Sequence, residues 1–184
     1  MILYVKQRGN QYYIYEEKEG PVNFHGYWHR NRKNGLHSKI LNVDNEEQLF
    51  VKVGKVSWIG MPKTYLFRIP AYATEIEVRL INVWRPHFQF QLGQSLYDFY
   101  CHAGHKKSLY KDNKQVAKYD KAIFKWAERD SGFMIANSDE DQMLVLGLFL
   151  MLDMGEENGA DVTADFGNLL SGVKDWNKYW LPNR

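Results

Sequence analysis

The chain has 184 residues, of which 45% are hydrophobic and 25% are charged, a composition typical of one soluble globular domain. Its formal net charge of +2 at pH 7 is too small to imply a nucleic-acid partner, because such proteins usually carry a clustered basic face. The single cysteine, Cys101, excludes an internal disulfide framework and favours a reducing, cytoplasmic location.

The first 17 residues contain two short runs of strand-forming residues, Ile2–Val5 and Tyr12–Tyr15, separated by turn residues at positions 8–10. This pattern predicts an opening β-hairpin. The same stretch lacks the basic region and long apolar segment of a secretion signal, which also favours the cytoplasm. Residues 19–35 then lose periodicity and are rich in glycine, so we expect an exposed loop with Phe24–Trp28 as a candidate strand.

From residue 36 onward, short apolar runs alternate with polar turns at the spacing of an all-β sandwich or barrel. The clearest alternation is Glu75–Leu80, and His87–Leu92 repeats it, so each of these strands should have one buried and one wet face. Further candidate strands include Val56–Ile59, Ile123–Ala127 and Phe133–Asn137. The chain offers about ten to twelve strands joined mostly by short turns, which favours antiparallel pairing of neighbours.

The longest apolar run, residues 142–152, predicts a helix over residues 138–153. Ser138 supplies a capping hydroxyl, and the carboxylates of residues 139–141 suit a helix start better than they suit catalysis. Gly155 is a typical helix end. A helix that is apolar on every side must be buried on every side, and this one has about half of the roughly 20 residues that a membrane span needs. We therefore expect no transmembrane segment and a helix at the centre of the sheet.

The C-terminal residues predict a second helix. An acidic stretch at residues 156–165 is typical of a linker. After it, apolar residues recur at helical spacing, which predicts an amphipathic helix packed on the outside of the protein. These residues are Phe166, Leu169, Leu170, Val173, Trp176 and Trp180. We assign residues 1–155 to one domain and residues 156–184 to a C-terminal extension packed on it.

Two patterns resemble the tubby C-terminal, scramblase and LURP-one-related family. The first is strand–turn–strand, at Ile40–Gly54 and again at Leu109–Lys118, and the second is the acidic start, apolar helix and closing aspartate of Ser138–Asp153. The resemblance covers residues 36–155 and implies a mainly β fold, a closed antiparallel barrel of about twelve strands around a central hydrophobic helix. An extra C-terminal helix would be added here, because the family's helix usually ends the domain. The basic positions through which tubby proteins bind phosphoinositides have no matched counterpart.

Histidine and cysteine offer no complete catalytic or metal constellation. Cys101 and His102 point to opposite faces of a strand, and no second cysteine or spaced histidine pair completes a tetrahedral set with His105. His25 and His29 would align as ligands only on a helix. Phosphate-binding loops and nucleophile elbows are also missing from the sequence. We therefore expect no catalytic residue, no metal and no cofactor, with an enzyme using His102 and His105 as the alternative.

Basic residues beside aromatic ones are the candidates for ligand binding, since such pairs can bind phosphates of lipid head groups. They lie in two separate turns, and a solvated loop is the alternative for both. The candidates are Arg30, Arg32 and Lys33 in the first turn and Lys106 and Lys107 in the second. The sequence thus favours a non-enzymatic binding module for anionic phospholipid head groups or a protein partner. The alternative is an interaction protein that self-associates through its C-terminal helix.

Overall fold

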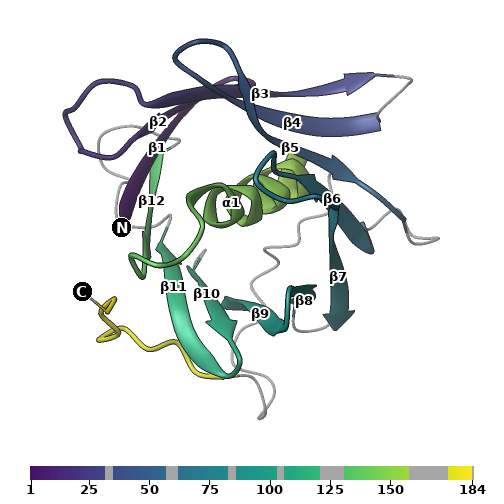
Figure 1. The fold of residues 1–184 in the computed structure, drawn as a ribbon, viewed down its shortest axis with the longest axis vertical. Coiled ribbons are helices and arrows are strands. Elements are labelled where there is room, and N and C mark those ends of the chain that lie inside the picture. Colours follow the sequence, from purple (N-terminus) through teal and green to yellow (C-terminus); the bar gives the residue numbers. More distant parts are fainter. Residues whose placement is uncertain are drawn as a thin grey trace.

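The computed structural model describes residues 1–31, 35–56, 62–82, 86–102, 106–120, 131–157 and 174–183, which form twelve strands and one helix (Figure 1). The elements are β1 (Ile2–Arg8), β2 (Gln11–Tyr15), β3 (Phe24–Asn31), β4 (Gly35–Asn42), β5 (Glu47–Val53), β6 (Thr64–Arg68), β7 (Ile76–Asn82), β8 (His87–Leu92), β9 (Ser95–His102), β10 (Lys106–Lys111), β11 (Lys114–Asp120), β12 (Ser131–Ala136) and α1 (Gln142–Glu157). The strands follow one another in chain order, and β1 pairs antiparallel with both β2 and β12, which closes a barrel. The predicted mainly β, closed antiparallel barrel is confirmed.

The alternation that predicted the strands also sets which side chains fill the barrel. In β7, Ile76 and Val78 are buried whereas Arg79 is exposed, as the period of two requires. The predicted hairpin turn between β10 and β11 is also present. Its two residues, Asp112 and Asn113, have φ of 48° and 67°, a left-handed conformation that these residue types tolerate.

Two predicted strands differ from the observed ones, and a third, Ile123–Ala127, lies outside the described residues. Val56 forms only an isolated bridge to Pro62, and residues 57–59 of that predicted strand also lie outside the described residues. Strand β3 is longer than predicted and reaches Asn31, so Arg30 belongs to a strand and not to a loop. Pairing with β4 along its whole length explains the extension.

Helix α1 begins four residues later than predicted and extends to Glu157, past Gly155. The cap is Asp141 and not Ser138: the Asp141 carboxylate accepts a hydrogen bond from Leu144 N at 2.8 Å, and its carbonyl accepts one from Val145 N at 3.1 Å. This is the geometry of an N-cap residue. Residues 138–140 form a turn before the helix instead of its first turn.

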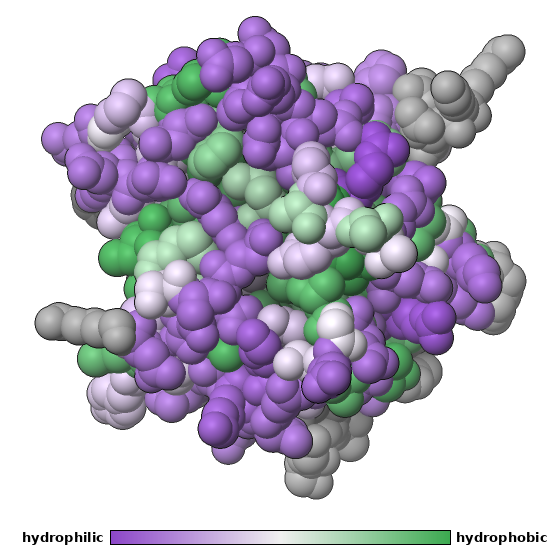
Figure 2. All heavy atoms as spheres, viewed as in Figure 1, coloured by the Kyte–Doolittle hydropathy of each residue, from purple (hydrophilic) through white to green (hydrophobic). Residues whose placement is uncertain are grey.

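The apolar side chains of α1 belong to the same core as those of the strands. Leu144, Val145, Leu146 and Leu148 are fully buried and join strand residues in one hydrophobic cluster. The helix contacts β4 and β5. Figure 2 shows a mostly hydrophilic face, with hydrophobic residues toward its middle and some at its edges. The burial expected for the apolar run is thus present.

Tyrosine hydroxyls from three strands form hydrogen bonds with α1 and the turn before it. The hydroxyl of Tyr119 on β11 donates to the carbonyl of Val145 at 3.1 Å, within the helix. The two other tyrosines bond carboxylates near the helix ends. These bonds join Tyr12 of β2 to Asp153 at 2.6 Å and Tyr97 of β9 to Glu140 at 3.1 Å. Each satisfies a buried polar group that would otherwise destabilise the fold.

The described C-terminal segment, residues 174–183, is not helical and contains one turn at residues 178–179. The predicted second helix is therefore wrong for this part, and the rest of it, residues 166–173, lies outside the described residues. The segment runs beside β10 and β11 (Figure 1). Lys118 of β11 donates to the carbonyl of Trp180 at 2.8 Å, and Asn183 N donates to the side chain of Asn137 at 2.9 Å. The described C-terminal segment is therefore held by individual contacts with its neighbours, and not by the apolar stripe of a helix.

Candidate functional site

Antiparallel strands in chain order place successive connections alternately at the two ends of the barrel. One end holds the connections β1–β2, β3–β4, β5–β6, β7–β8, β9–β10 and β11–β12. The other end holds the connections in between and the start of α1. The charged residues differ between these two ends.

The first end, called the basic end here, carries exposed or half-buried basic residues in or beside four of its connections. They are Arg8, Arg30, Lys55, Lys63 and Lys106. Asp120, the last residue of β11, also lies at this end. Basic residues therefore outnumber acidic ones in the described part of the basic end, which favours the approach of anions.

The opposite end, called the acidic end here, carries mostly carboxylates. Its exposed acidic residues are Glu16, Glu17, Glu19, Asp44, Glu46, Glu75, Asp112 and Asp139, beside the basic residues Lys18, Arg68 and Lys114. In the described part of the chain, charges of opposite sign thus predominate at the two ends of the barrel. Such a separation orients a protein in the field of a charged partner.

Of the predicted binding residues that the structure describes, Arg30 and Lys106 lie on the surface of the basic end. Arg30 is exposed near the end of β3, and Lys106 is half-buried at the start of β10. Around the barrel, β2, β1, β12 and β11 lie between those two strands, so the two residues stand on separate parts of the wall. Lys107 is 5% exposed, which removes it from the surface that a soluble ligand would touch. Arg32 and Lys33 lie outside the described residues.

Two exposed apolar side chains accompany the lysines at the basic end. Val56 is 53% exposed and Ile81 is 54% exposed, and both belong to the stretch where β5, β6 and β7 meet this end. Leu80 N donates a hydrogen bond to Lys63 O at 2.8 Å. Ile81, the next residue of β7, therefore lies close to Lys63, which directly precedes β6. We call Lys55, Val56, Lys63 and Ile81 the β5–β7 rim. Sequence reasoning missed it, because its members come together only through strand pairing.

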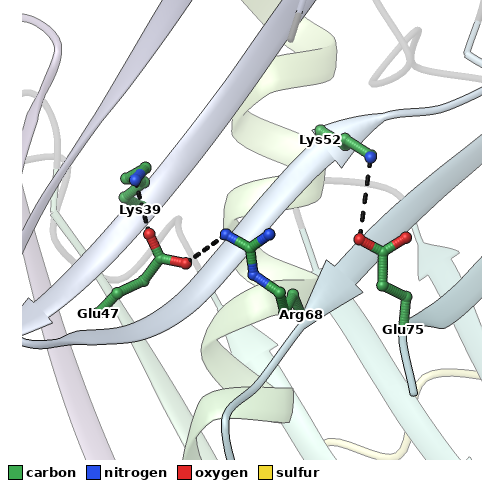
Figure 3. Close-up of polar contacts among 5 residues, drawn as sticks. All are labelled: Lys39, Glu47, Lys52, Arg68 and Glu75. Carbon is green, nitrogen blue, oxygen red and sulfur yellow. Dashed lines mark hydrogen bonds and ion pairs between the residues drawn. The ribbon is translucent and has the colours of Figure 1, made fainter. Parts of the chain in front are cut away.

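The basic residues on the outer face of β4, β5 and β6 are paired with carboxylates (Figure 3). Glu47 accepts hydrogen bonds from Lys39 and Arg68, both at 2.6 Å, and Lys52 lies 3.8 Å from Glu75. Burial alone would raise the pKa of Glu47, but the hydrogen bonds from Lys39 and Arg68 hold it below its ordinary value. These charges neutralise one another and link neighbouring strands.

A histidine and a serine lie close together on the outer face of β9 and β10. His102 Nε2 is 2.6 Å from Ser108 Oγ, a distance suited to a base and a nucleophile. However, Ser108 is buried, and the ring of Trp176 lies 5.5 Å from that of His102. Burial first, and then the nearby charge of Lys107, lower the pKa of His102 to about 4. The ring is thus neutral near pH 7, and the hydroxyl of Ser108 is not exposed to solvent as the nucleophile of a catalytic site must be.

The other histidines do not form the arrangements considered from the sequence. His25 and His29 lie on β3, a strand, where residues four apart are about 13 Å from each other. Within the described residues, no group of three or more histidine, cysteine, aspartate or glutamate side chains is placed to hold a metal ion. His105 lies outside the described residues.

The comparisons with known proteins do not identify a relative. No family model matches the chain, and neither the curated proteins nor the solved structures contain a significant match. In the described part of the chain, no helix combines the length and apolar character needed to cross a membrane.

Proposed function

We propose that the protein is a tubby-like barrel with α1 as its central helix, and that it binds anionic phospholipid head groups through its basic end without catalysing a reaction. The burial of α1 supports the first part. So does the position of Tyr12, Tyr97 and Tyr119, which reach the helix or its start from β2, β9 and β11, strands at different places around the wall.

The observation that carries the binding proposal is the separation of charge between the two ends of the barrel. Basic residues near an anionic lipid surface contribute about 1 kcal/mol each, and the field falls off within a Debye length. A protein with one basic and one acidic end would therefore orient its basic end toward the membrane. At the β5–β7 rim, Val56 and Ile81 would add apolar contact at the lipid boundary.

Reversing two charges of the rim should weaken binding to anionic vesicles. The variant Lys55→Glu with Lys63→Glu is compared with the wild type in flotation with phosphatidylcholine vesicles that contain or lack phosphatidylserine or a phosphoinositide. Loss of two favourable contacts of about 1 kcal/mol each predicts at least about 30-fold weaker partitioning to the anionic vesicles.

The matched control is Lys18→Glu with Lys114→Glu, which makes the same change in net charge at the acidic end. This control should bind as the wild type does. Equal loss in both variants would show that only net charge matters. Wild-type flotation independent of anionic lipid would refute the proposal.

The exposed apolar residues of the C-terminal segment favour self-association as a second candidate function. Tyr179 is 78% exposed and Leu181 is 75% exposed, beside the half-buried Trp180. Burial of such side chains between two copies would stabilise a dimer. Light scattering should then show a mass that rises with protein concentration, and Leu181→Asp should return it to that of a monomer. A wild-type monomer at every concentration would reject this candidate.

A further inference from the structure

Two tyrosines form a corner on the outer face of the barrel. The rings of Tyr100 on β9 and Tyr110 on β10 have centroids 5.6 Å apart and planes at 84° to each other. Two neighbouring rings at nearly a right angle form the two sides of a corner. We call this pair the tyrosine corner.

An ammonium group lies in this corner. Lys174 Nζ, from the C-terminal segment, is 3.9 Å from the centroid of the Tyr110 ring and 6.0 Å from that of Tyr100. It also donates to the backbone carbonyl and the side-chain oxygen of Asn113, each at 3.4 Å. Two aromatic faces and two amide oxygens thus contact one cation, a combination that favours ammonium groups.

The strands hold the tyrosine corner in place. The ring of His87 on β8 stacks on that of Tyr100, with centroids 4.4 Å apart and planes within 12°. Tyr110 is buried, and the carboxylate of Asp98 is close enough to Tyr100 to contribute to raising the pKa of its hydroxyl, after burial itself. The negative charge of Asp98 also attracts a cation in the corner. A site fixed in this way loses little entropy when a ligand binds.

We propose that the tyrosine corner is a binding site for alkylammonium groups, which Lys174 occupies as an intramolecular ligand. Nothing in the site is specific for a lysine of the same chain, since aromatic faces attract any ammonium group and accept its methylated forms. A tethered ligand competes at an effective concentration in the millimolar range. An external ammonium group must therefore displace Lys174 to bind. Asn113 places the corner toward the acidic end, away from the basic end.

Removing the Lys174 ammonium should open the site. The full-length Lys174→Gln variant and the wild type are titrated with tetramethylammonium chloride, against sodium chloride at equal ionic strength, while the NMR signals of Tyr110 are followed. We expect saturable binding to the variant that is about tenfold tighter than to the wild type. Lys178→Gln is the matched control, because Lys178 lies over Tyr179 of its own segment, and it should keep the wild-type affinity.

Two further variants test the aromatic ring in the Lys174→Gln background, and their binding is followed through the NMR signals of Tyr100 and Asn113, which also surround the ammonium group. Tyr110→Phe keeps the π face and should keep binding, whereas Tyr110→Leu keeps apolar bulk and should lose it. Absence of saturable shifts in Lys174→Gln, or equal binding by the Leu and Phe variants, would overturn the proposal. Titrations with phosphocholine and with a trimethyllysine amide then distinguish a lipid source of the ammonium group from a peptide source.

Discussion

Replacing Leu148 with aspartate should abolish folding. Leu148 is 0% exposed and lies in the middle of α1, among apolar side chains of the core. A carboxylate buried there without a partner costs several kcal/mol, whereas the whole stability of a domain is about 5 to 15 kcal/mol. Circular dichroism and size-exclusion chromatography should show loss of the cooperative thermal transition and a swollen or aggregated chain.

The control makes the same chemical change at an exposed position. Val43 is 68% exposed, and Val43→Asp should leave the melting temperature unchanged. A Leu148→Asp variant that folds and melts like the wild type would mean that α1 is accessible to water. The proposal of a central helix would then be untenable.

The burial of α1 could be predicted from the sequence, because a run that is apolar on all sides has no wet face. The residue at which α1 starts could not be predicted. Ser138 and Asp141 are both good capping residues, three positions apart, so local preference does not decide between them. Tertiary contacts decide: Glu140, between them, is buried and bonds the hydroxyl of Tyr97, which holds residues 138–140 in a turn. The helical spacing of Trp176 and Trp180 likewise led to a wrong prediction of a helix. In the structure the two rings pack separately, Trp176 against His102 and Trp180 against Lys118.

The charge separation could not be predicted, although every residue of it is visible in the sequence. In a barrel of consecutive antiparallel strands, one strand too many or too few moves every later connection to the opposite end. A predicted strand at Val56–Ile59, of which Val56 forms only a bridge, is enough to cause that error. The tyrosine corner depends further on the pairing of β9 with β10, which aligns Tyr110 with Asp98 and brings its ring beside Tyr100.

A bulkier residue at Gly147 should destabilise the protein through a clash with one strand. A Cβ at this position would lie 2.7 Å and 2.9 Å from two ring carbons of Phe67 on β6, closer than such atoms approach in real structures. Phe67 is itself fully buried, so its ring has little room to move. Gly147→Val should lower the free energy of unfolding by about 3 kcal/mol. Gly147→Ala should lower it less, since alanine favours the helix by about 1 kcal/mol.

Shrinking the facing ring should relieve part of this clash. Phe67→Leu alone leaves a cavity and destabilises, but combined with Gly147→Val the loss should be smaller than the sum of the two single losses, by about 1 kcal/mol or more. Urea denaturation of the wild type, both single variants and the double variant measures this coupling. Additive losses would mean that Gly147 and Phe67 do not touch. Helix α1 would then pack against the barrel wall in a register that keeps Gly147 away from Phe67.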